Sequence, residues 1–278
     1  MKKLPVILWI LFWGTPICFA DNHHPPEIKL SVVHVAWNDI MIGFQDARGL
    51  VTSPANFSQR DWLIAATGIS ASMLLMTMDK PIRQMVDRNY KGTLGDHFPN
   101  MIAKYGQIDY AAYLSLGMYG IGLFAQRDDL RLTGRMLTQG LIYTSSAIIL
   151  LRCGLGRIRP YQTEDPWNFK WFNTDILLRS FPSSHASTSF VLSTILSYRL
   201  NNRYMSAGLY SLALMIAILR VYQNQHWFSD VVVGSVLGIG ASRYVIGCEK
   251  RRYSQTEHQS SRWRIAPARG GLRLSYRF

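Results

Sequence analysis

The chain has few cysteines and few histidines, and both shortages limit the kind of protein that it can be. Three cysteines among 278 residues cannot form the disulfide framework that stabilises small secreted domains. We expect Cys153 and Cys248 at opposite ends of a helical bundle, so we predict that they do not bond to each other. We predict no metal and no cofactor, because the following histidines have no companions at metal-ligand spacing: His23, His24, His34, His97 and His258.

Very long hydrophobic runs are also absent, although the chain is not especially polar. The hydrophobic content is 48%, which is enough for a sizeable core in one helical domain. The mean hydropathy of +0.02 is low for a protein that crosses a membrane many times. The sequence has neither an internal repeat nor a low-complexity tract.

Acidic residues are scarce, since 17 Asp and Glu face 30 Lys and Arg, for a formal charge of +13. Such a balance can indicate nucleic-acid binding. Here much of the positive charge lies after residue 246 and in short segments between apolar runs. We therefore interpret it as charge at a membrane surface or at a phosphate site, and we predict no nucleic-acid partner.

The chain divides into four parts. Residues 1–20 have the charged start, the apolar centre and the small Ala20 of an export signal, with an uncleaved anchor as the alternative. Residues 21–60 form an N-terminal arm, in which 30–44 is a surface arm or an interfacial helix. Residues 61–247 form a helical domain. Residues 248–278 are a basic C-terminal tail, for which a docked or frayed segment is favoured over an outer-membrane strand.

Six apolar segments predict an all-α fold, a six-helix bundle. They cover residues 62–78, 110–125, 132–151, 186–200, 205–219 and 231–246. Each is near or below the roughly 17 to 25 residues that a spanning helix needs, and several contain Gly, Ser and Thr, which suit close helix packing. We favour a membrane-embedded bundle, with a soluble periplasmic bundle as the alternative.

Polar residues that flank these segments would meet at one end of an up-and-down bundle. They follow the third segment, open the fourth, close the fifth and open the sixth: Arg152, Arg159, His185, Arg220, His226 and Asp230. Their convergence predicts a phosphate site at that end of the bundle.

The chemistry of these residues fits phosphoryl transfer. A guanidinium group can bind two phosphate oxygens at once. The helix start at 181–187, capped by Ser183 or Ser184, presents free amides to an anion. Asp230 lies one helical turn after His226, so it can hold one imidazole nitrogen while the other attacks. His185 is then the natural general acid.

Three blocks of the sequence resemble the signature of the type 2 phosphatidic acid phosphatase family. The family pattern reads K-x6-R-P, P-S-G-H and S-R-x5-H-x3-D. The matching residues are Arg152, Arg159 and Pro160, then Pro182, Ser183 and His185, then Arg220, His226 and Asp230. In layout the resemblance extends over residues 62–246.

The resemblance implies specific roles. A phosphohistidine would form on His226 and His185 would protonate the leaving group, while the following groups would hold the phosphate: Arg152, Arg159, Arg220, Ser183 and the backbone amide of Ser184. Three positions depart from the pattern, because Arg152 replaces Lys, Ser184 replaces Gly and Leu219 replaces Ser.

By this resemblance the chain is a metal-independent phosphatase of a lipid phosphate or pyrophosphate, such as phosphatidate, phosphatidylglycerol phosphate, a polyprenyl pyrophosphate or a lipid A phosphate. Alternatives are a soluble periplasmic acid phosphatase of broad specificity, a vanadium haloperoxidase and a non-catalytic membrane protein that binds anionic lipid. Arg199, Arg203 and the basic tail lie at the end opposite the site. Six strict spans after an exported start would place the site in the cytoplasm, but the positive-inside rule favours a bacterial inner-membrane protein with its site facing the periplasm.

Overall fold

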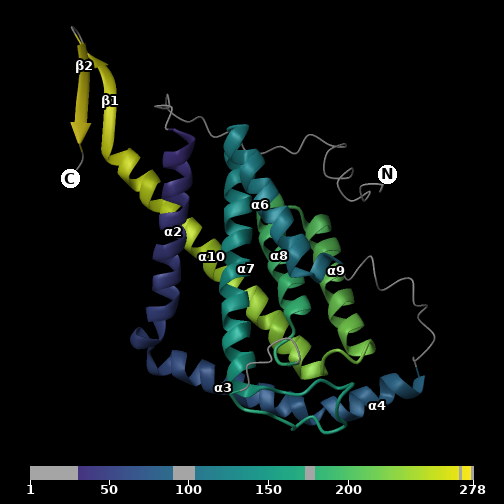
Figure 1. Cartoon of the computed structure of the whole chain (residues 1–278). Helices are drawn as coiled ribbons and strands as arrows, with labels where there is room; N and C mark the ends of the chain where they lie inside the picture. Colours follow the sequence, from purple (N-terminus) through teal and green to yellow (C-terminus); the bar gives the residue numbers. More distant parts are fainter. Residues whose placement is uncertain (1–30, 90–103, 173–178, 269–270, 277–278) are drawn as a thin grey trace, which may run out of the picture.

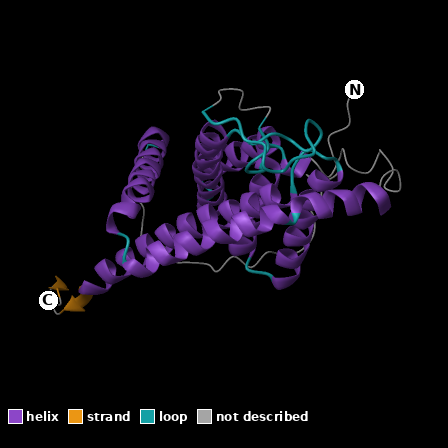
Figure 2. Ribbon diagram, turned by 90° about the horizontal axis from the view of Figure 1, so that it is seen from below, coloured by secondary structure: helices purple, strands orange, loops and turns teal. Residues whose placement is uncertain are grey.

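The computed structural model describes residues 31–89, 104–172, 179–268 and 271–276, and these are almost entirely helical (Figure 2). Within them lie eight α-helices: α2 (Val32–Thr52), α3 (Gln59–Thr77), α4 (Asp79–Asn89), α6 (Ile108–Phe124), α7 (Asp128–Leu155), α8 (Ser184–Leu200), α9 (Arg203–Tyr222) and α10 (Phe228–Arg262). Short 3-10 turns, η1 (Ser53–Asn56) and η2 (Lys104–Gly106), connect some of them. The all-α prediction is confirmed, and each of the six predicted segments is a helix. The predicted export signal at 1–20 lies outside the described residues.

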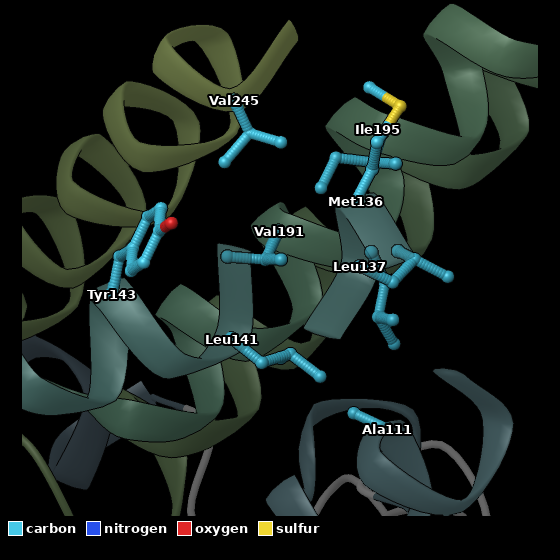
Figure 3. Close-up of a cluster of buried hydrophobic side chains, with 9 residues drawn as sticks. Ala111, Met136, Leu137, Leu141, Tyr143, Val191, Ile195 and Val245 are labelled. Atoms are coloured by element: carbon cyan, nitrogen blue, oxygen red, sulfur yellow. The ribbon is translucent and has the colours of Figure 1, made fainter. Parts of the chain in front are cut away.

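Helices α6 to α10 pack into an antiparallel bundle with α7 and α8 at its centre (Figure 1). The main core cluster draws side chains from four helices, among them Ala111 of α6, Leu137 of α7, Val191 of α8 and Val245 of α10 (Figure 3). All four are at most 1% exposed. Burying this apolar surface is the dominant favourable contribution to holding the bundle together.

Helices α3 and α4 run across the end of the bundle at which α7 ends and α8 begins (Figure 1). The first predicted apolar segment ends where expected, since α3 stops at Thr77. A second helix, α4, follows at once. It tolerates Pro81 because this residue lies in its first turn, where backbone N–H groups have no partner inside the helix. The pair is bent by 40° and forms either a broken span or a re-entrant segment.

Helix α2 lies along the bundle with its acids facing inward. Asp39 and Asp46 are buried, and Asp39 accepts hydrogen bonds from Arg131 and Arg135 of α7, both at 2.8 Å. Its outward face carries Trp37 and Phe44, which are 60% and 68% exposed. The predicted arm is therefore a helix held by ion pairs, with apolar side chains on its outer surface.

Three described helices are long and apolar enough to cross a membrane, namely Asp128–Leu155, Arg203–Tyr222 and Phe228–Gln255, and a fourth span is possible if α3 and α4 act together. Large apolar side chains on their outer surfaces are exposed, such as Leu150, Ile218 and Val236. The chain thus has the helices and the outer surface of a membrane protein.

The C-terminal part differs from the expected docked or frayed tail. Helix α10 continues through the predicted boundary at residue 247, because the polar stretch that follows is rich in helix-favouring Glu, Lys, Arg and Gln. After it, β1 (Trp263–Ala268) and β2 (Gly271–Tyr276) pair as an antiparallel hairpin. Cys153 and Cys248 are both free, as predicted.

Candidate active site

The abrupt C-terminus of α7 places the first block of arginines at the end of the bundle. Gly156 caps this helix with φ of +61°, in the left-handed region that favours glycine. A Cβ added there would lie 1.8 Å from the Lys170 carbonyl oxygen, so no other residue fits. The turn leaves Arg152 at the end of α7 and Arg157 just beyond it, both buried.

The first turn of α8 meets the first turn of α10 at very short range. Ser183 caps α8, and its amide donates to the Asp230 carbonyl at 3.0 Å. Gly234 and Gly238 allow this approach, since a Cβ on either would lie 2.4 Å from a carbonyl oxygen of Ser183 or Ser187. Two predicted blocks, far apart in sequence, are therefore brought together by backbone packing.

His226 is held by a backbone carbonyl rather than by the predicted carboxylate. Its Nδ1 lies 2.7 Å from the Ser180 carbonyl oxygen, whereas the nearest oxygen of Asp230 is 3.8 Å away. A carbonyl can only accept, so Nδ1 carries the proton and Nε2 keeps its lone pair. The tautomer is the one expected, although a different group selects it.

The environment of His226 favours its neutral form. Its side chain is only 2% exposed. Burial lowers the pKa of His226, and the charges of Arg159 and Arg152 add to this effect, whereas Asp230 opposes it. A neutral imidazole with a free Nε2 is the form that can attack phosphorus.

Three arginines predicted to bind phosphate lie near the two histidines. Arg152 donates to the Pro182 carbonyl at 3.0 Å and to the Ser184 hydroxyl at 3.3 Å, and Arg159 donates to Gln225 at 2.8 Å. The Nε of Arg220 is buried and has no hydrogen-bond partner within the described part of the chain. A buried donor without a partner is unfavourable, and an oxyanion would satisfy it.

His185 is half-buried in the first turn of α8, and the arginines influence it strongly. Burial lowers the pKa of His185 to about 3, and the charge of Arg220 adds to that effect. A phosphate group bound among the guanidinium groups would oppose their charge and raise this pKa. The structure thus places the following predicted residues at one end of the bundle: Arg152, Arg159, Ser183, Ser184, His185, Arg220, His226 and Asp230.

Sequence reasoning missed Asp79 and assigned no role to Arg157. Arg157 is fully buried and donates to Asp79 and to Asp230, both at 2.6 Å. Asp79 lies just before Pro81 in the sequence, and a single acid at such a position indicates no site by itself. The available signal for Arg157 was its position between the two arginines of the first block.

Comparisons relate part of this chain to known proteins. Residues 135–254 match the model of a family described as the PAP2 superfamily. The lipid A 1-phosphatase of Porphyromonas gingivalis is 26% identical over 176 residues, which cover 62% of this chain but only 35% of that relative. The chain thus matches about a third of the relative's length. The solved structure of LpxE from Aquifex aeolicus superimposes with a TM-score of 0.46 at 19% identity, covering 61% of this chain and 95% of that one.

Proposed function

We propose that this chain, which belongs to the PAP2 superfamily through residues 135–254, is a metal-independent lipid phosphatase that works through a phosphohistidine intermediate. One observation supports this most strongly: His226, with a free Nε2, shares one end of a membrane-type bundle with the buried Arg152 and the half-buried Arg159 and Arg220. The arginines would bind three phosphate oxygens, so that the fourth faces away from the attacking nitrogen.

In the first step Nε2 of His226 attacks phosphorus, a P–N bond forms, and the P–O bond to the leaving group breaks. His185 gives its proton to the departing oxygen. In the second step a water attacks the phosphohistidine, the P–N bond breaks, and His185 takes the proton from that water. The enzyme returns to its starting state and phosphate leaves.

The arginines would supply the stabilisation that other phosphatases obtain from metal ions. Guanidinium groups stay protonated and fork onto equatorial oxygens, where negative charge is spread in the transition state. Ser184 is the first residue of α8, so its amide is among those with no partner inside the helix. The hydroxyl of Ser183 completes the proposed phosphate cradle.

A lipid substrate follows from the surroundings of the site. The loop between α7 and α8 exposes aromatic side chains, with Trp171 at 61% and Phe172 at 87%, and the Phe172 amide donates to the carbonyl of Gly154, two residues after Arg152. Aromatic residues are enriched where a membrane meets water. A site at this level can reach a phosphate on a lipid head group, and the named relative makes a lipid A phosphate the first substrate to test.

The test is phosphate release by the full chain in detergent with a chelator present. The panel holds lipid A, phosphatidate, phosphatidylglycerol phosphate, a polyprenyl pyrophosphate and a water-soluble phosphomonoester. We expect turnover of a lipid, unchanged by the chelator and abolished by His226→Gln. Turnover by His226→Gln would refute the mechanism. Preference for the soluble ester would favour a periplasmic acid phosphatase. Binding of a lipid without turnover would favour a non-catalytic lipid-binding protein.

We further propose that the site faces the periplasm in a bacterial inner membrane. The end of the bundle away from the site carries Arg199, Arg203 and the basic segment 250–252. Basic residues near span ends favour the cytoplasmic side. Labelling of single cysteines placed in the 160–172 loop and in the tail, with a membrane-impermeant maleimide on intact cells, would test this orientation. Labelling of the tail alone would refute it.

A further inference from the structure

We propose that Asp79 of α4 is a positioning residue that fixes the nucleophile His226 from outside the bundle. The inference rests on the proposed function, since it assigns a role in that same site. Asp79 lies on the helix that runs across the site end of the bundle, and it is separated by 147 positions from His226. No block of the family signature includes it.

Both oxygens of the Asp79 carboxylate are committed to other elements. Oδ1 accepts from the Ser229 amide at 2.8 Å, and Oδ2 accepts from the Ser229 hydroxyl and from Arg157 Nη2, both at 2.6 Å. The side chain is fully buried. The first turn of α10 is therefore attached to α4 by two bonds, in addition to its own helical bonds.

Arg157 continues this attachment to Asp230 and to Ser180, which lie beside the nucleophile. Its Nη1 donates to Asp230 Oδ1 at 2.6 Å. Asp230 Oδ2 in turn accepts at 2.9 Å from the amide of Trp227, the residue that directly follows His226. The Arg157 carbonyl accepts from the Ser180 amide at 2.9 Å. The Ser180 carbonyl is the group that receives Nδ1 of His226.

The chemistry of the contacts explains why an acid stands at this position. The Arg157 guanidinium and the Ser229 amide can only donate hydrogen bonds. The Ser229 hydroxyl already accepts from Arg157 Nη1 at 2.7 Å, so its own proton is directed at Asp79. All three partners thus donate to Asp79. An asparagine would turn an NH2 group toward one of these donors and would break the attachment.

We expect Asp79→Asn to lower kcat by about 10- to 100-fold, as loss of groups that orient a reacting side chain does elsewhere. KM should stay within about twofold, because the phosphate-binding arginines are not touched. The kinetics are measured per folded enzyme, after size-exclusion chromatography and thermal melting. A purely structural acid would lower the folded fraction and leave kcat unchanged.

The control is Asp128→Asn at the start of α7, the end of the bundle away from the site. Asp128 pairs with Arg131 at 2.8 Å, and its side chain is 54% exposed. We expect wild-type kcat and KM from this variant. If Asp79→Asn does not fold, Ser229→Ala decides, since it removes one donor to Asp79 and keeps every charge. We expect a several-fold lower kcat from it, and an unchanged kcat would overturn the proposal.

A second readout does not depend on turnover. The side-chain 15N resonances of His226, assigned with His226→Gln in micelles, report the bond from Nδ1 to the Ser180 carbonyl. We expect them to shift in Asp79→Asn and not in Asp128→Asn. If the wild type hydrolyses no ester but the shift occurs, the proposed function fails and the positioning role stands. If the wild type turns over while Asp79→Asn keeps its kcat and resonances, the positioning role fails.

Discussion

Replacing Arg157 by lysine is expected to destabilise the protein strongly, although the charge is preserved. Arg157 uses three different nitrogens, with Nε bonded to the Pro166 carbonyl at 2.9 Å, Nη1 to Asp230 and Nη2 to Asp79. A lysine has one nitrogen on a flexible stem. It can reach one of these carboxylates but not both together with the carbonyl.

The magnitude follows from the groups left behind. Asp79 and Asp230 are both 0% exposed in their side chains, so neither can replace a lost partner with water. A buried hydrogen bond to a charged group contributes about 1.5 to 3 kcal/mol, and breaking a buried pair costs about 3 to 5 kcal/mol. Losing two of the three attachments should therefore cost at least about 3 kcal/mol, out of a typical total of about 5 to 15 kcal/mol.

Thermal melting of the purified protein in one detergent measures this loss. About 3 kcal/mol corresponds to a decrease in Tm of about 6 to 12 °C for a chain of this size class. The control is Arg127→Lys, which removes a two-point contact with Asp129 from an arginine that is 57% exposed. It should melt like the wild type. Equal melting of the two variants would refute the structural role of Arg157.

Three further predictions concern the charge, the packing and the departures from the family pattern. A bound anion should raise the pKa of His185, so that a proton is taken up on binding and the affinity for the anion increases as the pH falls. Sulfate is the probe because it does not titrate between pH 7 and 5, and its affinity should rise by up to about tenfold per pH unit. Isothermal titration should show this rise for the wild type and not for His185→Gln. Gly238→Ala should destabilise by about 1 to 3 kcal/mol in melting experiments, because its Cβ meets a carbonyl, whereas Gly240→Ala, with nothing within 4 Å, should be neutral or stabilising. Ser184→Gly should change kcat/KM by no more than about tenfold, since Arg152 keeps its bonds to a backbone carbonyl, and a larger loss would make the hydroxyl essential.

Much of the helical architecture could be predicted from local sequence. Apolar segments of helical length mark α6 to α10, and the first predicted segment ends with α3. Polar stretches were harder, because the acids of α2 and the charged extension of α10 are stabilised by partners elsewhere. Asp39, for example, lies in the interior only because Arg131 and Arg135 meet it there.

The candidate site shows the same division. Residue type and spacing suffice to propose His226, His185 and the arginines, since phosphate chemistry needs a nucleophile, an acid and fixed positive charge. The acceptor for Nδ1 of His226 could not be foreseen. Spacing along one helix suggested Asp230, but the carbonyl of Ser180, from another segment, lies closer.

Residue types at short spacings are enough to predict the helical class, the family resemblance and the residues of the candidate site. The groups that support that site emerge only from the packing of the helices. Asp79 and Arg157 are linked across 78 positions by a bond of 2.6 Å, and no local pattern encodes such a contact. Long-range pairing arises from how the helices pack, and here the close approach of α8 and α10 at Gly234 and Gly238 brings the blocks of the site together.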